Sequence, residues 1–328
     1  MLQISKLISA PFVYVDCGAR GDVSNPLLSI FAESRYIGFD PAFTDTVEKE
    51  QGSSLFFPTA LGERAGTSKF HRTRNPNCSS FFVPDQNFLD RFIEIGTMFT
   101  VEETLPLKVA ALDQYLPGNG INDIYFIELD TQGSELDILR GAGNFLSSSV
   151  VGVRVEVGFS PMYLRQPLFA DVDSFLQKFG FRLFDLEKYH LRRKTPNPDI
   201  RCREQIVWGQ ALFFRDLKIS QLPMLKQKSL KLAMAASFYG FHSFAIEMLE
   251  HLLNNGAGMF SSADKDFLQS SYDNYVRSLT ERRSARLLRL MKHFPLLRKL
   301  SSRLGSLFTQ LGEKFGSASS DAGYFWKD

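Results

Sequence analysis

The stretch Val13-Tyr14-Val15-Asp16-Cys17-Gly18-Ala19-Arg20-Gly21-Asp22 decides the fold. It is an apolar run, typical of a buried strand, that ends in an acid and is followed by two glycines. A second run of this kind, Arg35-Tyr36-Ile37-Gly38-Phe39-Asp40, ends in another acid 19 residues after Gly21. A strand, a glycine turn, a helix and an acid-tipped second strand form one half of a nucleoside-binding α/β fold.

The acid at position 16 indicates which nucleoside this half-fold would bind. The dinucleotide fingerprint has glycine there, because a pyrophosphate must approach the backbone. Asp16 would repel a pyrophosphate, but it suits a cofactor with a cationic end, and S-adenosylmethionine carries an ammonium and a sulfonium. Gly18 and Gly21 permit positive φ angles and leave room for a ligand, while Asp40 is placed to bind ribose hydroxyls. We predict that these four residues contact S-adenosylmethionine; the alternative is that the two acids only cap turns.

The rest of the first two thirds of the chain continues the α/β pattern. We expect helices near residues 22–33 and 42–51, between continuous apolar strands, which argues for a mostly parallel sheet covered on both faces. The seven strands of this Rossmann-like sheet are expected near residues 12–16, 36–40, 55–60, 124–130, 150–157, 181–186 and 206–214.

Further acids follow the later strands. Glu128 and Asp130 are two residues apart, so a strand places both on one face, and a buried strand rarely carries two acids without a role. Asp130 lies at the carboxyl end, where open α/β sheets bind ligands, and Glu156 ends the neighbouring strand. We predict Asp130 as the leading general base, or as a cofactor ligand, with Glu156 behind it. His190, expected in a loop at the same edge, is a third catalytic candidate, although a lone loop histidine often has no such role.

Composition and charge divide the chain into two parts. The 328 residues, 44% hydrophobic and 23% charged, are typical of a globular protein. We predict an α/β domain over residues 1–217 and a helical extension over 218–328; the first carries 22 Lys/Arg against 27 Asp/Glu, the second 16 against 9. Cys17, Cys78 and Cys202 are far apart, so we expect no metal site and a cytoplasmic, reducing environment.

The extension is most basic over residues 277–303, where nine Lys/Arg accompany one acid, Glu281. Apolar residues recur at helical spacing from Leu287 to Leu311 within the segment 277–311. Such a helix can pack with its basic face in water, lie on the inner face of a membrane, or join copies of the chain into a homo-oligomer. We expect no nucleic acid partner, because aromatic and basic residues do not interleave.

Together these motifs resemble the FkbM-type methyltransferase family over roughly residues 12–214. The resemblance rests on VDCGARGD at 15–22, GFDP at 38–41, LDQYL at 112–116, FIELDTQGSELDILRGAGNFL at 126–146, RVEVGFSPMY at 154–163 and GFRLFDL at 180–186. It implies a class I S-adenosylmethionine fold and O-methylation of a hydroxyl on a sugar, glycan or related small molecule. It supports Asp16, Gly18, Gly21 and Asp40 as cofactor contacts, with Asp130 and Glu156 as active-site acids.

Two positions depart from the family pattern, and two other functions stay open. Glu128 stands where the family commonly has lysine, and Gln132 where many members have glutamate, so substrate contacts there do not transfer. A nicotinamide-dependent oxidoreductase would share the fold, although Asp16 disfavours it. A cofactor-binding scaffold without catalysis is the non-enzymatic alternative, against which the acids at 128, 130 and 156 argue.

Overall fold

The computed structural model describes residues 2–19, 25–42, 47–49, 54–197, 200–217, 226–256 and 258–293. Gly21, one of the predicted cofactor contacts, lies outside these described residues. The chain forms two compact units, Met1–Tyr272 and Asp273–Asp328. The cavities and proposals below all belong to the first unit, and the division of the chain between residues 217 and 218 stays a prediction.

The central element is an eight-stranded sheet in the order β10-β11-β9-β8-β1-β2-β4-β3. Its seven predicted strands are all confirmed, and a short edge strand adds to them. The parallel core pairs β4 with β2, β2 with β1, β1 with β8 and β8 with β9, while β11, β10 and β3 pair antiparallel. The strands are β1 (Phe12–Cys17), β2 (Ser34–Phe39), β3 (Val47–Lys49), β4 (Ser54–Phe57), β8 (Phe126–Leu129), β9 (Gly152–Gly158), β10 (Phe181–Leu191) and β11 (Gln205–Arg215).

Both helices expected in the first third of the chain are corrected. The helix expected over residues 42–51 is wrong, because β3 occupies part of that range and hydrogen-bonds to the otherwise open edge of β4. Within the range 22–33 the described residues form only a short 3-10 helix, η2 (Pro26–Ile30). Asn25 caps this helix by accepting a bond from the Leu27 N–H at 3.0 Å, and Pro26 begins it.

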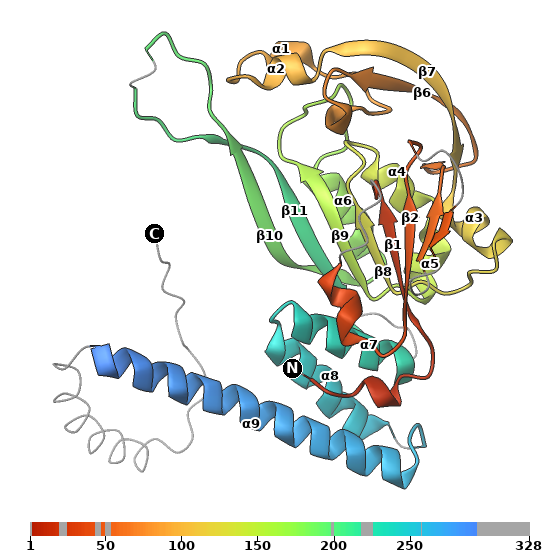
Figure 1. The fold of residues 1–328 in the computed structure, drawn as a ribbon, viewed down its shortest axis with the longest axis vertical. Coiled ribbons are helices and arrows are strands. Elements are labelled where there is room, and N and C mark those ends of the chain that lie inside the picture. Colours follow the sequence, from red (N-terminus) through yellow and green to blue (C-terminus); the bar gives the residue numbers. More distant parts are fainter. Residues whose placement is uncertain are drawn as a thin grey trace. The chain divides into compact units, whose positions relative to one another are not determined.

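A second sheet lies beyond the carboxyl ends of the parallel strands (Figure 1). It contains β5 (Ala60–Leu61), β6 (Gly66–Thr73) and β7 (Val101–Ala110) in the order β5-β7-β6. The chain between β6 and β7 forms η3 (Pro76–Cys78), α1 (Gln86–Leu89) and α2 (Ile95–Met98). Leu89, Phe92 and Phe99 from this segment share a buried cluster with Met162 and Tyr163. The cluster packs the segment between β6 and β7 against the loop after β9, and this contact helps to hold the second sheet in position.

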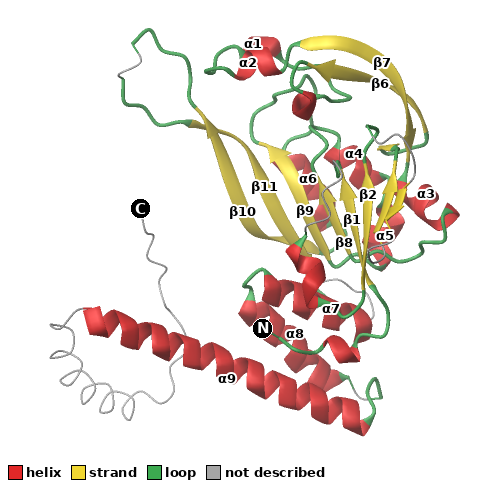
Figure 2. Cartoon of the chain, in the orientation of Figure 1, coloured by secondary structure: helices red, strands yellow, loops and turns green. Residues whose placement is uncertain are grey.

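Several helices of the first unit pack against the central sheet, and Figure 2 distinguishes helices from strands by colour. Tyr115 stacks edge-on against Phe39 and Phe57, so α3 lies on the face to which these two residues point. On the opposite face, Tyr239 at the end of α7 packs against Phe126 and Phe214. The helices are η1 (Ser5–Leu7), α3 (Leu112–Gly118), α4 (Glu135–Arg140), α5 (Gly143–Ser148), α6 (Phe169–Gln177), α7 (Lys226–Phe238), α8 (His242–Asn255) and α9 (Ser262–His293).

The basic segment of the extension is only partly described. Residues 277–293 belong to α9, and residues 294–311 lie outside the described residues. Membrane contact or oligomer contact through 277–311 therefore stays a prediction. In the part of the chain that the structure describes, no helix is both long and apolar enough to cross a bilayer.

Candidate functional site

Gly18 is the point at which three strand ends of the central sheet meet. Its N–H donates to the Phe39 carbonyl at 2.8 Å, and the Asp130 N–H donates to the Cys17 carbonyl at 3.0 Å. The φ angle of Gly18 is +99°, and a Cβ added there would lie 2.2 Å from the Asp130 carbonyl oxygen. Only glycine fits this position, because any side chain would be both strained and in collision with the end of β8.

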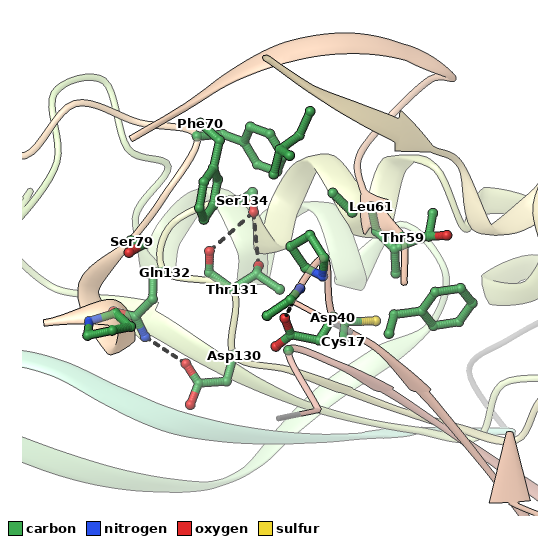
Figure 3. Close-up of a pocket in the computed structure, with 18 of the residues that line it drawn as sticks. Cys17, Asp40, Thr59, Leu61, Phe70, Ser79, Asp130, Thr131, Gln132 and Ser134 are labelled. Atoms are coloured by element: carbon green, nitrogen blue, oxygen red, sulfur yellow. Dashed lines mark hydrogen bonds between the residues drawn. The ribbon is translucent and has the colours of Figure 1, made fainter. Parts of the chain in front are cut away.

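A cavity of about 370 Å³ opens beside this point, between the carboxyl edge of the central sheet and the second sheet. We call it the first cavity. Figure 3 shows Phe70 on the side of the cavity opposite Asp40 and Asp130. The residues lining it are Cys17, Gly18, Phe39, Asp40, Pro41, Ala42, Thr59, Ala60, Leu61, Phe70, Arg72, Pro76, Asn77, Ser79, Phe81, Leu105, Leu107, Asp130, Thr131, Gln132 and Ser134.

The predicted acid at the tip of β2 lies in this first cavity. Asp40 is half-buried, and its Oδ1 accepts a hydrogen bond from the Ala42 N–H at 2.8 Å. This bond is the turn cap that the sequence allowed as the alternative role. It holds the carboxylate in one orientation, and a capped carboxylate still has lone pairs for two ribose hydroxyls.

Asp16 points to the other face of the sheet and lines a different cavity. Its Oδ2 accepts a hydrogen bond from the Tyr36 hydroxyl at 2.6 Å. Burial, together with the nearby carboxylates of Glu128, Asp130 and Asp40, raises the pKa of Asp16 to about 7, although the bond from Tyr36 favours the charged form. A bound cation would favour the ionised form of this carboxyl group.

This second cavity, of about 580 Å³, is rich in acids and amides. Of the described residues, Gly18 and Asp130 are the two that line both this cavity and the first one. The residues lining it are Asp16, Gly18, Ala19, Asn25, Pro26, Tyr36, Glu128, Asp130, Arg154, Asp185, Glu187, Gln210, Leu212, Phe238 and Tyr239.

Glu128 faces the second cavity and is held by two partners. It accepts a hydrogen bond from the Tyr14 hydroxyl and forms an ion pair with Arg154, which stands beside it in register on β9. This acid stands where the family commonly has lysine, and Arg154 supplies the positive charge beside it. The pair explains how the strand can bury an acid at position 128.

The loop after β8 is held together by Glu135, a residue that the sequence pattern did not single out. The buried Glu135 carboxylate accepts from the Thr131 N–H at 2.9 Å and from the Gly133 N–H at 3.0 and 2.9 Å. Burial raises the pKa of Glu135 to about 7 against the opposing effect of these backbone bonds. The spacing of Thr131, Gly133 and Glu135 is the signal that could have indicated this role, because an acid soon after a strand-end loop can close that loop.

Gln132 joins the two predicted active-site acids. Its Nε2 donates to Asp130 Oδ1 at 2.7 Å and to Glu156 Oε1 at 3.1 Å. Its Oε1 accepts from the Tyr163 hydroxyl at 3.2 Å, and its carbonyl accepts from the Ser80 hydroxyl at 2.6 Å. The backbone φ angle of Gln132 is 59°, in the left-handed region that residues other than glycine seldom adopt. Asp130 and Glu156 therefore accept hydrogen bonds from the same amide nitrogen and are neighbours in a single network.

His190 lies apart from this network. It was expected in a loop, but it belongs to the exposed part of β10, where it pairs with Ile206 of β11. It lines neither the first nor the second cavity. The long β10–β11 hairpin extends the strand beyond the range predicted from sequence, because the apolar alternation fades there while the backbone pairing continues.

Comparisons with known proteins place the chain in a family. Among curated proteins there is no match. A solved structure, the methyltransferase FkbM from Methylobacillus flagellatus KT, is similar at 17% sequence identity and a TM-score of 0.32. The similarity covers 62% of this chain and 43% of that one, so this chain spans less than half of that protein's length. The sequence profile of the family described as "Methyltransferase FkbM domain" matches residues 10–183, more than half of the chain, and the chain therefore belongs to the FkbM methyltransferase domain family.

Proposed function

We propose that the protein is an S-adenosylmethionine-dependent O-methyltransferase acting on a hydroxyl of a sugar, glycan or related small molecule. The observation that carries the proposal is the junction at Gly18. There the tips of β1, β2 and β8 bring Asp16, Asp40 and Asp130 around one glycine that tolerates no side chain. Family membership supports a methyltransferase, and the acids support the choice of donor.

The residues around the first cavity fit S-adenosylmethionine in size and in chemistry. A volume of about 370 Å³ is that of a small-molecule site. Asp40 would hold the ribose hydroxyls, and the apolar wall that contains Leu61, Phe70 and Phe81 would cover the adenine. Phe70 and Phe81 contact each other edge to face with ring centroids 5.3 Å apart, so the wall is preformed.

The charged end of the donor would lie at the junction of the two cavities. Asp130 lines both cavities, and Asp16 lines the second beside Gly18. Two carboxyl groups close to a sulfonium and an ammonium supply the compensating charge that a positive ligand needs. A pyrophosphate in the same place would face both acids, which disfavours the nicotinamide-dependent alternative.

When bound, this donor supplies a sulfonium methyl group, whose transfer to a hydroxyl oxygen leaves a thioether and one proton for the protein to accept. Asp130 is our candidate for the group that accepts this proton. Gln132 holds its Oδ1 at 2.7 Å, and among the described residues no other donor contacts this carboxylate. The second oxygen of Asp130 is thus available to an acceptor hydroxyl. Such a base contributes roughly 10²–10⁴-fold to a rate.

Calorimetry on the full-length protein tests the choice of donor. We expect binding of S-adenosylmethionine and S-adenosylhomocysteine, and no binding of NAD. Asp40→Asn should weaken both donor ligands by about 10- to 100-fold, because hydrogen bonds to a charged group contribute roughly 1.5–3 kcal/mol. Binding of NAD in preference to S-adenosylmethionine would contradict the proposal.

Asp130→Asn separates catalysis from binding. If Asp130 is the general base, the variant should lose turnover and keep its affinity for the cofactor. If Asp130 is a cofactor ligand, the variant should lose that affinity. Methyl transfer to a panel of sugars and glycans reports turnover, and unchanged turnover would rule out both roles. Donor binding with no transfer by the wild-type protein to any acceptor would favour the non-catalytic scaffold.

A further inference from the structure

The second cavity reaches too far across the sheet to serve the donor alone. It runs from Asp16 on β1 to Asp185 and Glu187 on β10. In the strand order β1-β8-β9-β11-β10 these ends are four strands apart, which is roughly 19 Å at about 4.8 Å for each step. The methionine part of the donor is the size of one amino acid and would occupy only the end beside Gly18. The part over β9, β11 and β10 is left for a different molecule.

The charge of this far part selects the kind of molecule. Among the described residues, the cavity is lined by five carboxyl groups and by one cationic side chain, Arg154. Arg154 is already paired with Glu128, so its charge does not offset that of Asp185 and Glu187. Clefts lined by one sign of charge concentrate ligands of the other sign. An anionic acceptor such as a uronic acid or a sugar phosphate would be repelled.

The uncharged side chain of Gln210 in the same part of the cavity also requires a hydrogen-bond donor from the ligand. Gln210 lines the cavity from β11, the strand between β9 and β10, and its Oε1 is buried with no hydrogen-bond partner among the described residues. A buried acceptor without a partner is costly, and in a cavity the partner can come from a ligand. Gln210 stands in register with Glu187 and with Glu156, so the neighbouring side chains on its row are acceptors too.

On the basis of the function proposed above, we propose that the second cavity is the acceptor site and that it takes a hydroxylated acceptor carrying a protonated amine. An ammonium offers three donors and no acceptor, which matches a lining of carboxylates and one unpartnered amide oxygen. Because the cavity meets the first one at Gly18 and Asp130, the acceptor hydroxyl would lie beside the donor's methyl group while the amine lies toward β10.

Two matched pairs of small molecules test this on the full-length protein saturated with S-adenosylhomocysteine. Serinol has an amine where glycerol has its central hydroxyl, and glucosamine has a protonated amine where N-acetylglucosamine has a neutral amide. We expect the amine of each pair to bind at least about tenfold more tightly in calorimetry, since a charge-assisted hydrogen bond contributes that much or more. The preference should shrink as salt rises, and glycerate should not bind.

The double variant Asp185→Asn with Glu187→Gln keeps the shape of the two side chains and removes their charge. It should lower amine binding about tenfold and leave S-adenosylhomocysteine binding within about twofold. Asp266→Asn, an exposed acid on α9 that lines neither cavity, is the matched control and should change neither.

The outcomes that would reject the acceptor site differ from the one that would reject the proposed function. Equal binding within both pairs, no binding of either amine, or an unaffected double variant would overturn the acceptor site. Loss of S-adenosylhomocysteine binding in the double variant would also overturn it, because the two acids would then belong to the donor site. If S-adenosylhomocysteine does not bind the wild-type protein, the proposed function itself is rejected.

Discussion

The first and second cavities share Gly18 and Asp130 but differ in what surrounds these two residues. The first is covered by apolar side chains of the second sheet, such as Phe70 and Leu105. The second lies on the opposite face of the central sheet, and its described lining includes five acids from three strands or their ends, β1, β8 and β10. One sheet thus offers a site with an apolar cover and an acidic site at a common junction. Two cavities that meet at one point would suit a methyl transfer, because a donor and an acceptor must come together at the reacting atom.

The largest expected effect comes from a change at the junction. Gly18→Ala places a Cβ against the Asp130 carbonyl oxygen in a backbone conformation with positive φ. We expect a loss of about 3–5 kcal/mol in the free energy of unfolding, and loss of ligand binding in both cavities. Thermal unfolding and calorimetry with S-adenosylhomocysteine measure the two effects.

Gly66→Ala is the matched control for that change. Gly66 lies in β6, and a Cβ there would meet nothing within 4 Å, so stability and binding should stay close to those of the wild type. If Gly18→Ala behaves like Gly66→Ala, the two cavities do not depend on the junction.

The next largest effect is expected from a change at Gln132, which should lower turnover more than it lowers donor affinity. Gln132→Leu removes the amide that holds Asp130 and Glu156 and leaves the Tyr163 hydroxyl with one acceptor, the Cys78 carbonyl. We expect kcat to fall about 10- to 100-fold, because a base that is not held in position loses much of its contribution. Donor affinity should change less than kcat. An equal loss of both would show that Gln132 maintains the cavity and does not position the base.

A smaller effect, specific to the second cavity, follows from Asp16. Its pKa of about 7 lies above the ordinary value of 3.8, so the folded state holds an extra proton between these values. The stability contributed by that proton is present at low pH and is lost as pH rises from about 4 to about 7. A cationic donor binds the ionised form, so its affinity should rise about tenfold from pH 6 to pH 8 with release of a proton.

Asp16→Asn tests both consequences of this pKa. The amide can still accept from the Tyr36 hydroxyl, and we expect the unliganded protein to gain about 1–2 kcal/mol above pH 7, because a buried charge is removed. Donor affinity should fall and lose its dependence on pH. The measurements are thermal unfolding at several pH values and calorimetry in buffers of different ionisation enthalpy. A variant that is less stable at pH 8, or that keeps the pH dependence, would assign the titration to another group, such as Glu135.

The smallest effect is expected at His190. Because this residue is exposed on β10 and lines neither cavity, His190→Gln should change kcat/KM by less than about twofold, within the range of ordinary surface substitutions. A loss of tenfold or more in methyl transfer would restore His190 as a catalytic candidate and weaken the assignment of the base to Asp130.

The parts of this arrangement that depend on local sequence could be predicted. The strand that leads into Asp16 and Gly18, and the one that leads into Asp40, can be recognised within a few residues, since the period of the pattern and the glycine spacing suffice. The placement of Asp130 and Glu156 at neighbouring strand ends followed from the order of parallel strands.

The parts that depend on distant contacts could not. Gln132 becomes a bridge only because Tyr163 and Ser80, 31 and 52 residues away, fix its side chain and backbone. The roof of the first cavity comes from a sheet that pairs residues 66–73 with 101–110, and no local pattern places that sheet over the carboxyl edge. His190 was expected in a loop because strand pairing with residue 206 is invisible to local periodicity.

A crystal structure of the protein with S-adenosylhomocysteine tests the central claim most directly. The account predicts the adenine in the first cavity against Phe70, the ribose on Asp40, and the sulfur at the junction of Gly18 and Asp130, with the part of the second cavity over β10 left free for an acceptor. An adenine bound in the second cavity, or a ligand that leaves the junction untouched, would contradict it.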